Sequence, residues 1–227
     1  MTDSERDRSA NGPIDTEQTI RARRELVLSI SRYERLSGAV IEAMLSVPRH
    51  LFVPAAYREL AYDDGPLPIG AGQTISQPTV VAMMTEALEL RGPETVLEIG
   101  TGSGYQAAVL SRLCRQVHSI ELIPELAQAA RAALATAGYD NVQVHIRDGY
   151  GGLPEYAPFD GIIITAAPPE LPPLLIEQLR EDGRMVVPVG PTLGLQELLV
   201  LRKVAGRLEE VSLGPVRFVP MVQQRSR

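Results

Sequence analysis

Glycines that follow an apolar stretch have the spacing most typical of ligand binding in this chain. They run Gly-x-Gly-x-Gly directly after residues 95–99. A dinucleotide fingerprint has the spacing Gly-x-Gly-x-x-Gly, and its third glycine position is occupied here by the bulky Tyr105. A phosphate-binding loop would need Gly-Lys-Ser/Thr after the turn, and that motif does not follow. The spacing therefore disfavours an NAD-linked reductase. The loop residues predicted to approach a ligand are Gly100, Thr101, Gly102 and Gly104.

Acidic residues stand at the ends of three successive predicted strands. Glu98 and Glu121 belong to the first two strand ends, and Asp148-Gly149 follows the third. A carboxylate beside the glycine loop would repel a pyrophosphate but would tolerate a cofactor that carries positive charge. S-Adenosylmethionine has a sulfonium and an ammonium group, a ribose diol that suits the second acid and an adenine amino group that suits the third. Loop and acids together predict S-adenosylmethionine as the cofactor, with S-adenosylhomocysteine as its product.

Composition limits the function further. The 227 residues carry 28 acidic and 22 basic side chains, and this net charge of −6 argues against nucleic-acid binding, which needs a clustered positive surface. A single cysteine, Cys114, excludes an internal disulfide and multi-cysteine metal sites, and we expect no metal. No apolar run has membrane-spanning length, and the polar start is unlike a secretory signal. We therefore expect a cytoplasmic protein that binds neither nucleic acid nor membranes.

The segments before the glycine loop must help to position it. Residues 1–16 have few apolar side chains and are predicted to form a disordered tail. Apolar residues at helical spacing over 17–45 predict two helices with a break at 37–38. A loop-rich stretch follows over 47–78, and a helix is predicted over 79–90. A stretch of that length without regular structure is usually functional in a compact domain.

Strands and helices alternate after residue 92. This order is typical of an α/β protein with a doubly wound, mostly parallel Rossmann-like sheet and helices on both faces. Ligands bind such sheets at the carboxyl ends of the strands, which is where the glycine loop is expected. Strands are predicted over residues 95–99, 117–122, 142–146, 159–165, 185–189, 197–204 and 216–219. Helices are predicted over residues 105–114, 124–138 and 172–180.

Motifs along most of the chain resemble those of one family. Residues 74–78 read Thr-Ile-Ser-Gln-Pro and residues 165–168 read Thr-Ala-Ala-Pro. Both are specific to the protein-L-isoaspartate (D-aspartate) O-methyltransferases, which the chain resembles, whereas the glycine loop is generic to class I methyltransferases. Tyr150 is a departure, since many members carry tryptophan there. The similar stretches are residues 46–54, 67–78, 96–106, 117–121, 148–149, 158–168 and 215–220.

This resemblance implies an activity and a site. The activity is methyl transfer from S-adenosylmethionine to the free carboxylate of L-isoaspartyl and D-aspartyl residues in damaged proteins and peptides, which starts repair through a succinimide. Ser76 would be the active-site residue and would contact the substrate, which Val219 and Pro220 would help to cover. The residues implied around the cofactor are Thr74, Ile75, Glu98, Glu121, Asp148 and Gly149.

The length predicts one methyltransferase domain over residues 17–227, because domains average about 150 residues. We expect residues 17–92 to cover the substrate and residues 93–190 to form the cofactor-binding core. Residues 191–227 are expected to supply late strands and a cover for the active site. We also expect a monomer.

Ser76 has a second, structural interpretation. It precedes Pro78 and a predicted helix, and position alone favours a helix N-cap. The family motif favours the active-site role, and the two roles are compatible. The substrate carboxylate ionises with a pKa of about 4, so the reaction needs no general base. The protein must instead align a weak nucleophile with the methyl group and exclude water.

Other functions remain as alternatives. A related carboxyl methyltransferase could modify an ordinary aspartate in one dedicated peptide. A nucleic-acid methyltransferase is less favoured, because the place of its Asp/Asn-Pro-Pro-aromatic motif reads Ala-Ala-Pro-Pro-Glu over residues 166–170 and Cys114 lies on the wrong element for a nucleophile. A cofactor-binding module without turnover is disfavoured by the intact Thr-Ile-Ser of residues 74–76.

Overall fold

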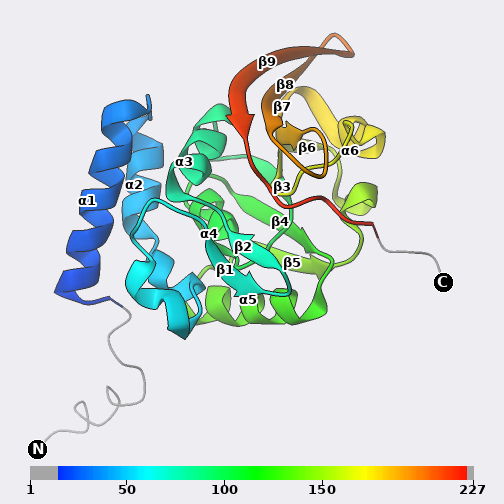
Figure 1. The fold of residues 1–227 in the computed structure, drawn as a ribbon. Coiled ribbons are helices and arrows are strands. Elements are labelled where there is room, and N and C mark those ends of the chain that lie inside the picture. Colours follow the sequence, from blue (N-terminus) through cyan, green and yellow to red (C-terminus); the bar gives the residue numbers. More distant parts are fainter. Residues whose placement is uncertain (1–14, 224–227) are drawn as a thin grey trace, which may run out of the picture.

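A sheet of strands β3 to β9 forms the middle of the protein (Figure 1). In the computed structural model, which describes residues 15–223, the strands lie in the order β5-β4-β3-β6-β7-β8-β9. Strands β3 to β7 are parallel, and β8 and β9 add to one edge in antiparallel pairing. The predicted mostly parallel, doubly wound sheet is confirmed. The strands are Thr95–Ile99 (β3), Gln116–Glu121 (β4), Val142–Ile146 (β5), Phe159–Ile164 (β6), Leu179–Val189 (β7), Gln196–Val204 (β8) and Arg207–Val216 (β9).

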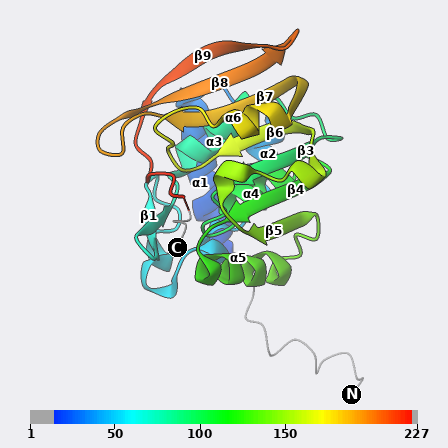
Figure 2. The ribbon, with the colours of Figure 1, turned by 90° about the vertical axis from the view of Figure 1, so that its right-hand side faces the viewer.

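The chain changes direction across the sheet between β3 and β6. From β3 it adds β4 and then β5 on one side, and it returns to place β6 on the other side of β3. Loops that leave the carboxyl ends of two such strands diverge and open a crevice. Figure 2 shows the strands in this order, with β1 and the C-terminal segment together at one end of them.

Neighbouring residues of each strand face opposite layers of helices. Val96 packs in a cluster with Met84 of α3 and Leu110 of α4, whereas Leu97 packs in a cluster with Leu175 of α6. Helices therefore cover both faces of the sheet, as predicted, and α5 packs against β5 and β4. These helices are Pro78–Ala87 (α3), Tyr105–Ser111 (α4), Pro124–Thr136 (α5) and Pro173–Gln178 (α6).

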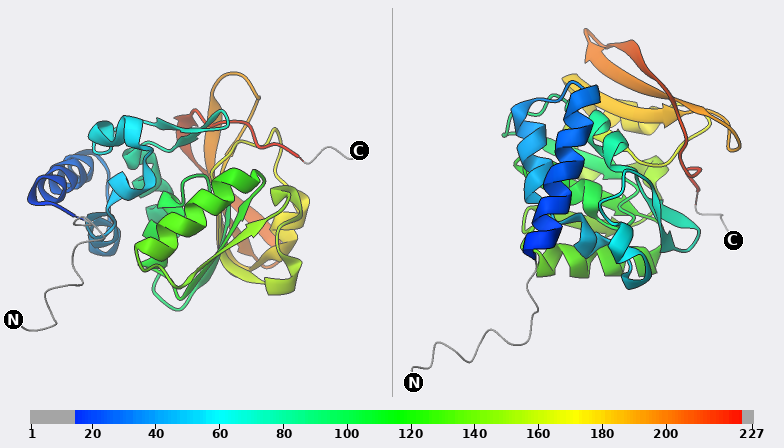
Figure 3. Two further views of the ribbon diagram at one scale, coloured as in Figure 1. Left: turned by 90° about the horizontal axis from the view of Figure 1, so that it is seen from below. Right: turned by 60° about the vertical axis from the view of Figure 1, so that its left-hand side comes forward.

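Two N-terminal helices form a further layer outside α3 and α4 (Figure 3). They are α1, Glu17–Tyr33, and α2, Gly38–Ser46, and the predicted break between them is confirmed. Thr16 caps α1 in a capping box with Thr19, and the Ser37 hydroxyl accepts the Val40 N–H at the start of α2. Of the predicted disordered tail, residues 1–14 lie outside the described residues. The division of the chain into three functional parts stays a prediction.

The stretch predicted to be loop-rich contains a β-hairpin. Its strands are β1, Leu67–Gly70, and β2, Gln73–Ile75, which pair in antiparallel fashion. The turn places Ala71 and Gly72 at φ values of +50° and +71°, which is the backbone twist that two-residue hairpins favour. The sequence conceals this hairpin because its strands are short and proline is depleted in strands. The same stretch contains the 3₁₀ helices Arg49–Phe52 (η2) and Ala55–Leu60 (η3).

The predicted start of β7 was wrong. The helix predicted over 172–180 ends at Gln178, and β7 begins at Leu179 instead of at 185. This first part of β7 is rich in charged residues, and Asp182 has a φ of +62° where the register with β6 shifts. From the sequence alone, an irregular and polar strand of this kind cannot be distinguished from a turn.

The last predicted strand, over 216–219, was also wrong. The final strand lies earlier, as β9, and ends at Val216. Because β9 is an edge strand with mostly exposed side chains, it lacks the alternation of apolar and polar residues that marks a half-buried strand. Apolar residues 218–221 instead leave the sheet and pass across the carboxyl ends of its strands.

None of the helices within residues 15–223 has both the length and the apolar character that a membrane span requires.

Candidate active site

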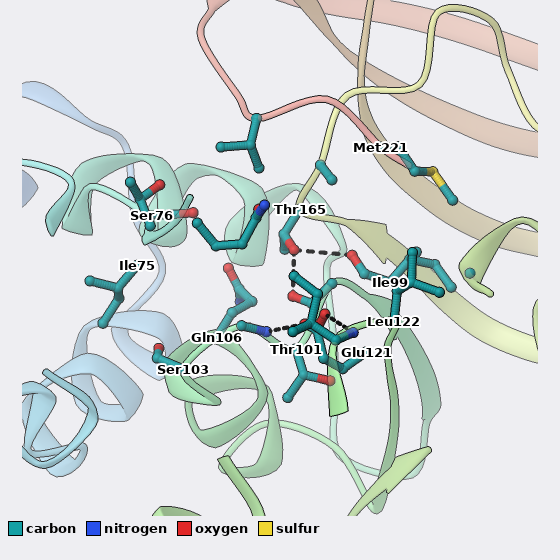
Figure 4. Close-up of a pocket in the computed structure, with 18 of the residues that line it drawn as sticks. Ile75, Ser76, Ile99, Thr101, Ser103, Gln106, Glu121, Leu122, Thr165 and Met221 are labelled. Atoms are coloured by element: carbon teal, nitrogen blue, oxygen red, sulfur yellow. Dashed lines mark hydrogen bonds between the residues drawn. The ribbon is translucent and has the colours of Figure 1, made fainter. Parts of the chain in front are cut away.

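A cavity opens where the loops after β3 and β6 diverge (Figure 4). With its open mouth included it encloses about 830 Å³, within the range of roughly 300–1,000 Å³ for small-molecule sites. Its walls come from the ends of β3, β4, β5 and β6, from the hairpin and from residues 219–222. Ser76 and Glu121 approach it from opposite sides. This is the place where the topology predicts a ligand.

The first glycine of the loop is required by the geometry at this crevice. Gly100 has a φ of +97°, and a Cβ atom there would lie 2.5 Å from Oγ1 of Thr165. The Thr165 hydroxyl donates to the carbonyl oxygens of Gly100, at 2.6 Å, and Ile99, at 3.0 Å. The Thr165 side chain, which follows β6, thereby fixes the position of the loop after β3. Only glycine permits the close approach that brings the loop backbone to the cavity.

Glu121 is fixed at the end of β4 by two backbone amides. Its Oε2 accepts the Gly102 N–H at 2.8 Å, and its Oε1 accepts the Ile123 N–H at 3.0 Å. Each carboxylate oxygen keeps a further lone pair, and the side chain borders the cavity. This arrangement offers two adjacent acceptors to a ligand with a diol.

The charge of the cavity favours a cationic ligand. Among the lining residues within 15–223, Glu121 and Tyr105 are the ionisable ones. Burial raises the pKa of Tyr105 to about 12, so its hydroxyl is neutral at pH 7. Glu121 then carries the one formal charge of the described lining, and that charge is negative. The residues present therefore fit a sulfonium cofactor with a ribose diol and would repel a pyrophosphate.

A strap from the C-terminal segment, residues 217–222, closes one side of the cavity. The Ala167 N–H donates to the Val219 carbonyl at 2.8 Å, and the Met221 N–H donates to the Ala167 carbonyl at 2.8 Å. The Tyr150 hydroxyl donates to the Met221 carbonyl at 3.3 Å, so tyrosine at this position fastens the strap. The strap residues that line the cavity are Val219, Pro220, Met221 and Val222.

Comparison with known proteins identifies the family of this chain. The family model of protein-L-isoaspartate(D-aspartate) O-methyltransferase matches residues 21–226. The chain belongs to this family.

Individual relatives agree with the family assignment. The protein-L-isoaspartate O-methyltransferase of Myxococcus xanthus is 54% identical over 86% of this chain and 93% of its own. A solved protein-L-isoaspartate O-methyltransferase is 31% identical with a TM-score of 0.78, over 87% of this chain and 65% of that one. A Plasmodium falciparum structure in complex with S-adenosyl-L-homocysteine has a TM-score of 0.79 at 23% identity, over 89% of this chain and 99% of that one, and bears on the fold alone.

Membership of this family confirms several predictions. The protein is an enzyme, an O-methyltransferase that uses S-adenosylmethionine, and the predicted Rossmann-like methyltransferase fold is confirmed. The nucleic-acid methyltransferase, reductase and non-catalytic interpretations are set aside.

Most predicted site residues of the methyltransferase meet at the cavity. They come from the hairpin, the glycine loop, the ends of β4 and β5, and the strap. Those that line it are Thr74, Ile75, Ser76, Gly100, Thr101, Gly102, Glu121, Gly149, Val219 and Pro220. Their contacts with cofactor or substrate stay predictions.

Three predicted cofactor residues do not line the cavity. Gly104 begins α4, and a Cβ atom there would touch Ala130 and Leu134 of α5 at 3.4 Å, so this glycine serves helix packing. Asp148 accepts the Tyr150 N–H at 2.9 Å and caps a 3₁₀ helix, Gly149–Gly151 (η4). Glu98 is fully buried beneath the glycine loop.

The N-cap interpretation of Ser76 was wrong. The N-cap of α3 is Gln77, and the Ser76 hydroxyl has no hydrogen-bond partner within residues 15–223. Ser76 is half-buried at the cavity. Its hydroxyl is therefore available to a ligand.

Several lining residues were missed. Leu122 and Thr165 follow β4 and β6 directly, and the rule of strand ends that identified Glu121 would have found them. Ser103, Gln106 and Met221 carried no signal of their own. The lining residues that were not predicted are Gln73, Val81, Ile99, Ser103, Tyr105, Gln106, Ile120, Leu122, Ile123, Thr165, Ala166, Met221 and Val222.

A buried hydrogen-bond chain runs from the cavity wall to Glu98. The Ser119 hydroxyl donates to Oε2 of Glu98, and the Thr101 hydroxyl lies 2.5 Å from that of Ser119. Oε1 of Glu98 has no partner within the described residues. Burial raises the pKa of Glu98 from an ordinary value of 4.5 to about 8. At pH 7 this carboxyl is therefore mostly protonated in the folded enzyme.

We expect Glu98 to make the stability of the ligand-free enzyme depend on pH. Between pH 4.5 and about pH 8 the folded protein keeps a proton that the unfolded chain releases, so the free energy of unfolding falls as pH rises through this window. Glu98→Gln keeps the shape without the titration and should flatten this fall. Chemical denaturation at both ends of the window measures it, with Glu125→Gln on the exposed side of α5 as the control. An unchanged fall in Glu98→Gln would contradict the prediction.

Proposed function

We propose that the enzyme methylates the free α-carboxylate of L-isoaspartyl residues and the side-chain carboxylate of D-aspartyl residues, and so starts their repair through a succinimide. The observation that carries the proposal is Ser76, whose hydroxyl faces the cavity that also contains the glycine loop and Glu121. Family membership supports the same substrate class. The expectations of a monomer, a cytoplasmic location and no binding to nucleic acid or membranes stay predictions.

The residues of the cavity suit a positioning mechanism. When bound, S-adenosylmethionine supplies a methyl group already activated by its sulfonium. Glu121 and the backbone of the glycine loop bind and orient this cofactor. The Ser76 hydroxyl donates to one oxygen of the substrate carboxylate and directs the other oxygen toward the methyl group. The hairpin and the strap exclude water from the reacting atoms.

Proton transfer has no necessary part in this reaction. A substrate carboxylate has a pKa of about 4 and is ionised at neutral pH. Of the ionisable lining residues in the described chain, Tyr105 has a pKa of about 12 and Glu121 is engaged by two backbone amides. Neither is arranged as a general base, which agrees with the chemistry proposed.

Paired synthetic peptides test the proposal. The two peptides have the same sequence, and one joins its aspartate through the side-chain carboxylate while the other has the ordinary linkage. We expect methyl transfer to the isoaspartyl peptide, with the aspartyl peptide at background, because only the first presents a free α-carboxylate beside the chain. Preference for the ordinary peptide would support the alternative of a dedicated aspartate modifier.

A further inference from the structure

The chain around Ser76 is anchored on its N-terminal side by the hairpin. Ile75 pairs with Leu67 across β1 and β2, and both side chains are buried. Thr74 pairs with Pro68 one step away. Ser76 is the next residue after this pairing ends. The backbone on this side therefore has a defined position.

Asp64 anchors the C-terminal side of Ser76. Its Oδ1 accepts the Thr79 N–H at 2.9 Å, and its Oδ2 accepts the Thr79 hydroxyl at 2.7 Å and Nε2 of Gln77 at 3.0 Å. The N-cap residue Gln77 makes no capping bond with its own side chain. The first turn of a helix has N–H groups without intrahelical partners. Asp64 satisfies one of them from fifteen residues upstream.

Arg49 fixes the backbone on either side of Asp64. Its Nε donates to the Ala61 carbonyl at 2.9 Å, and its Nη2 donates to the Gly65 carbonyl at 3.2 Å. The Arg49 side chain is fully buried, and its guanidinium lies 4.9 Å from the centre of the Tyr105 ring, which lines the cavity. The exposed turn that contains Asp64 is thereby connected, through Arg49, to the wall of the cavity.

We infer that Asp64 is a positioning residue that directs the Ser76 hydroxyl into the cavity by capping α3 from a distance. The inference rests on the proposed function, since it presumes that Ser76 contacts the substrate. Residues 64–68 supply both anchors. Asp64 accepts a hydrogen bond from the chain after Ser76, and β1 pairs with the chain before it. Loss of the Asp64 cap frees the start of α3 and lets the hydroxyl move away from the substrate carboxylate.

Substitutions at Asp64 show whether its hydrogen bonds or its negative charge are responsible for this role. Asp64→Ala removes all three hydrogen bonds and should lower kcat/KM for the isoaspartyl peptide about fivefold, with the dissociation constant of S-adenosylhomocysteine unchanged. Asp64→Asn still accepts the Thr79 N–H, as asparagine is a good cap, and should restore most of the activity. Thr79→Val loses the hydroxyl bond alone and should show a smaller loss. Asp63→Ala is the matched control, since Asp63 is the exposed neighbour and its side chain has no hydrogen bond within residues 15–223.

The decisive measurement repeats Asp64→Ala in the Ser76→Ala background. If Asp64 acts through Ser76, the second substitution should cost less than twofold in kcat/KM there. The same fivefold loss in both backgrounds would overturn the inference, because a general weakening of the fold does not depend on the Ser76 hydroxyl. If Ser76→Ala itself is fully active, the proposed role of Ser76 fails and the inference fails with it. Melting temperatures of every variant identify any that do not fold.

Discussion

Glu121→Ala is expected to raise the dissociation constant of S-adenosylhomocysteine about 100-fold, or by about 2.8 kcal/mol. Glu121 borders the cavity, and each of its carboxylate oxygens keeps a lone pair that could accept a ribose hydroxyl. Hydrogen bonds to a charged acceptor contribute roughly 1.5–3 kcal/mol each. Alanine also leaves the N–H groups of Gly102 and Ile123 without their acceptor, which loosens the glycine loop. Isothermal titration with S-adenosylhomocysteine measures the change.

Glu121→Gln sharpens this prediction. Each carboxylate oxygen accepts a backbone N–H, at 2.8 Å from Gly102 and at 3.0 Å from Ile123. Whichever way a glutamine amide turns, its NH₂ group faces one of these donors. We therefore expect glutamine to weaken cofactor binding by at least about tenfold, although it matches glutamate in size. Glu125→Gln, four residues on at the exposed start of α5, should bind normally. Normal binding by both Glu121 variants would exclude the ribose role.

The sheet could be predicted because its central strands are buried on both faces. Residues 95–99 form a strand with the predicted bounds, and β4 and β6 differ from the predicted 117–122 and 159–165 by no more than one residue at either end. Runs of buried apolar residues between turn residues mark such strands in any sequence. The edge strand β9 and the first part of β7 could not be placed, because their exposed and charged side chains leave no periodic pattern.

The candidate site could be predicted in part, for a topological reason. Parallel strands end at one edge of the sheet, so residues at successive strand ends meet there without any knowledge of the packing. This rule brought together the glycine loop, Glu121 and Gly149. It misplaced Glu98, because residues within a strand alternate between its faces and Glu98 faces Ser119 below the cavity.

Contacts between segments that lie far apart along the chain could not be predicted from the sequence. The approach of Thr165 to Gly100 depends on β6 returning beside β3, which no local pattern encodes. The cap that Asp64 supplies to Thr79 likewise depends on the hairpin. Position before a helix suggested that Ser76 was the N-cap of α3. The N-cap is instead Gln77, and the side-chain hydrogen bond to the first turn comes from Asp64 in another segment.

Ser76→Ala is expected to lower kcat/KM for the isoaspartyl peptide by about 1–3 kcal/mol of transition-state stabilisation, or roughly 5- to 150-fold. The Ser76 hydroxyl has no hydrogen-bond partner within residues 15–223, so its removal breaks no bond of the described fold. The melting temperature and the affinity for S-adenosylhomocysteine should stay unchanged, since the cofactor contacts that we propose are those of Glu121 and the glycine loop. Initial rates over a range of peptide concentrations measure the loss.

A second serine-to-alanine variant shows whether the loss of kcat/KM is specific to the hydroxyl at the cavity. Ser31→Ala on α1 removes a hydroxyl that donates to the Leu28 carbonyl at 3.0 Å, far along the chain from the cavity residues. It should leave the kinetics unchanged. Full activity in a folded Ser76→Ala would mean that the substrate carboxylate is oriented by other groups, and the backbone around Thr74 and Ile75 would then be the place to look. A loss confined to kcat/KM, with cofactor binding intact, instead supports a contact of the Ser76 hydroxyl with the substrate carboxylate, since a contact with the cofactor would also change its affinity.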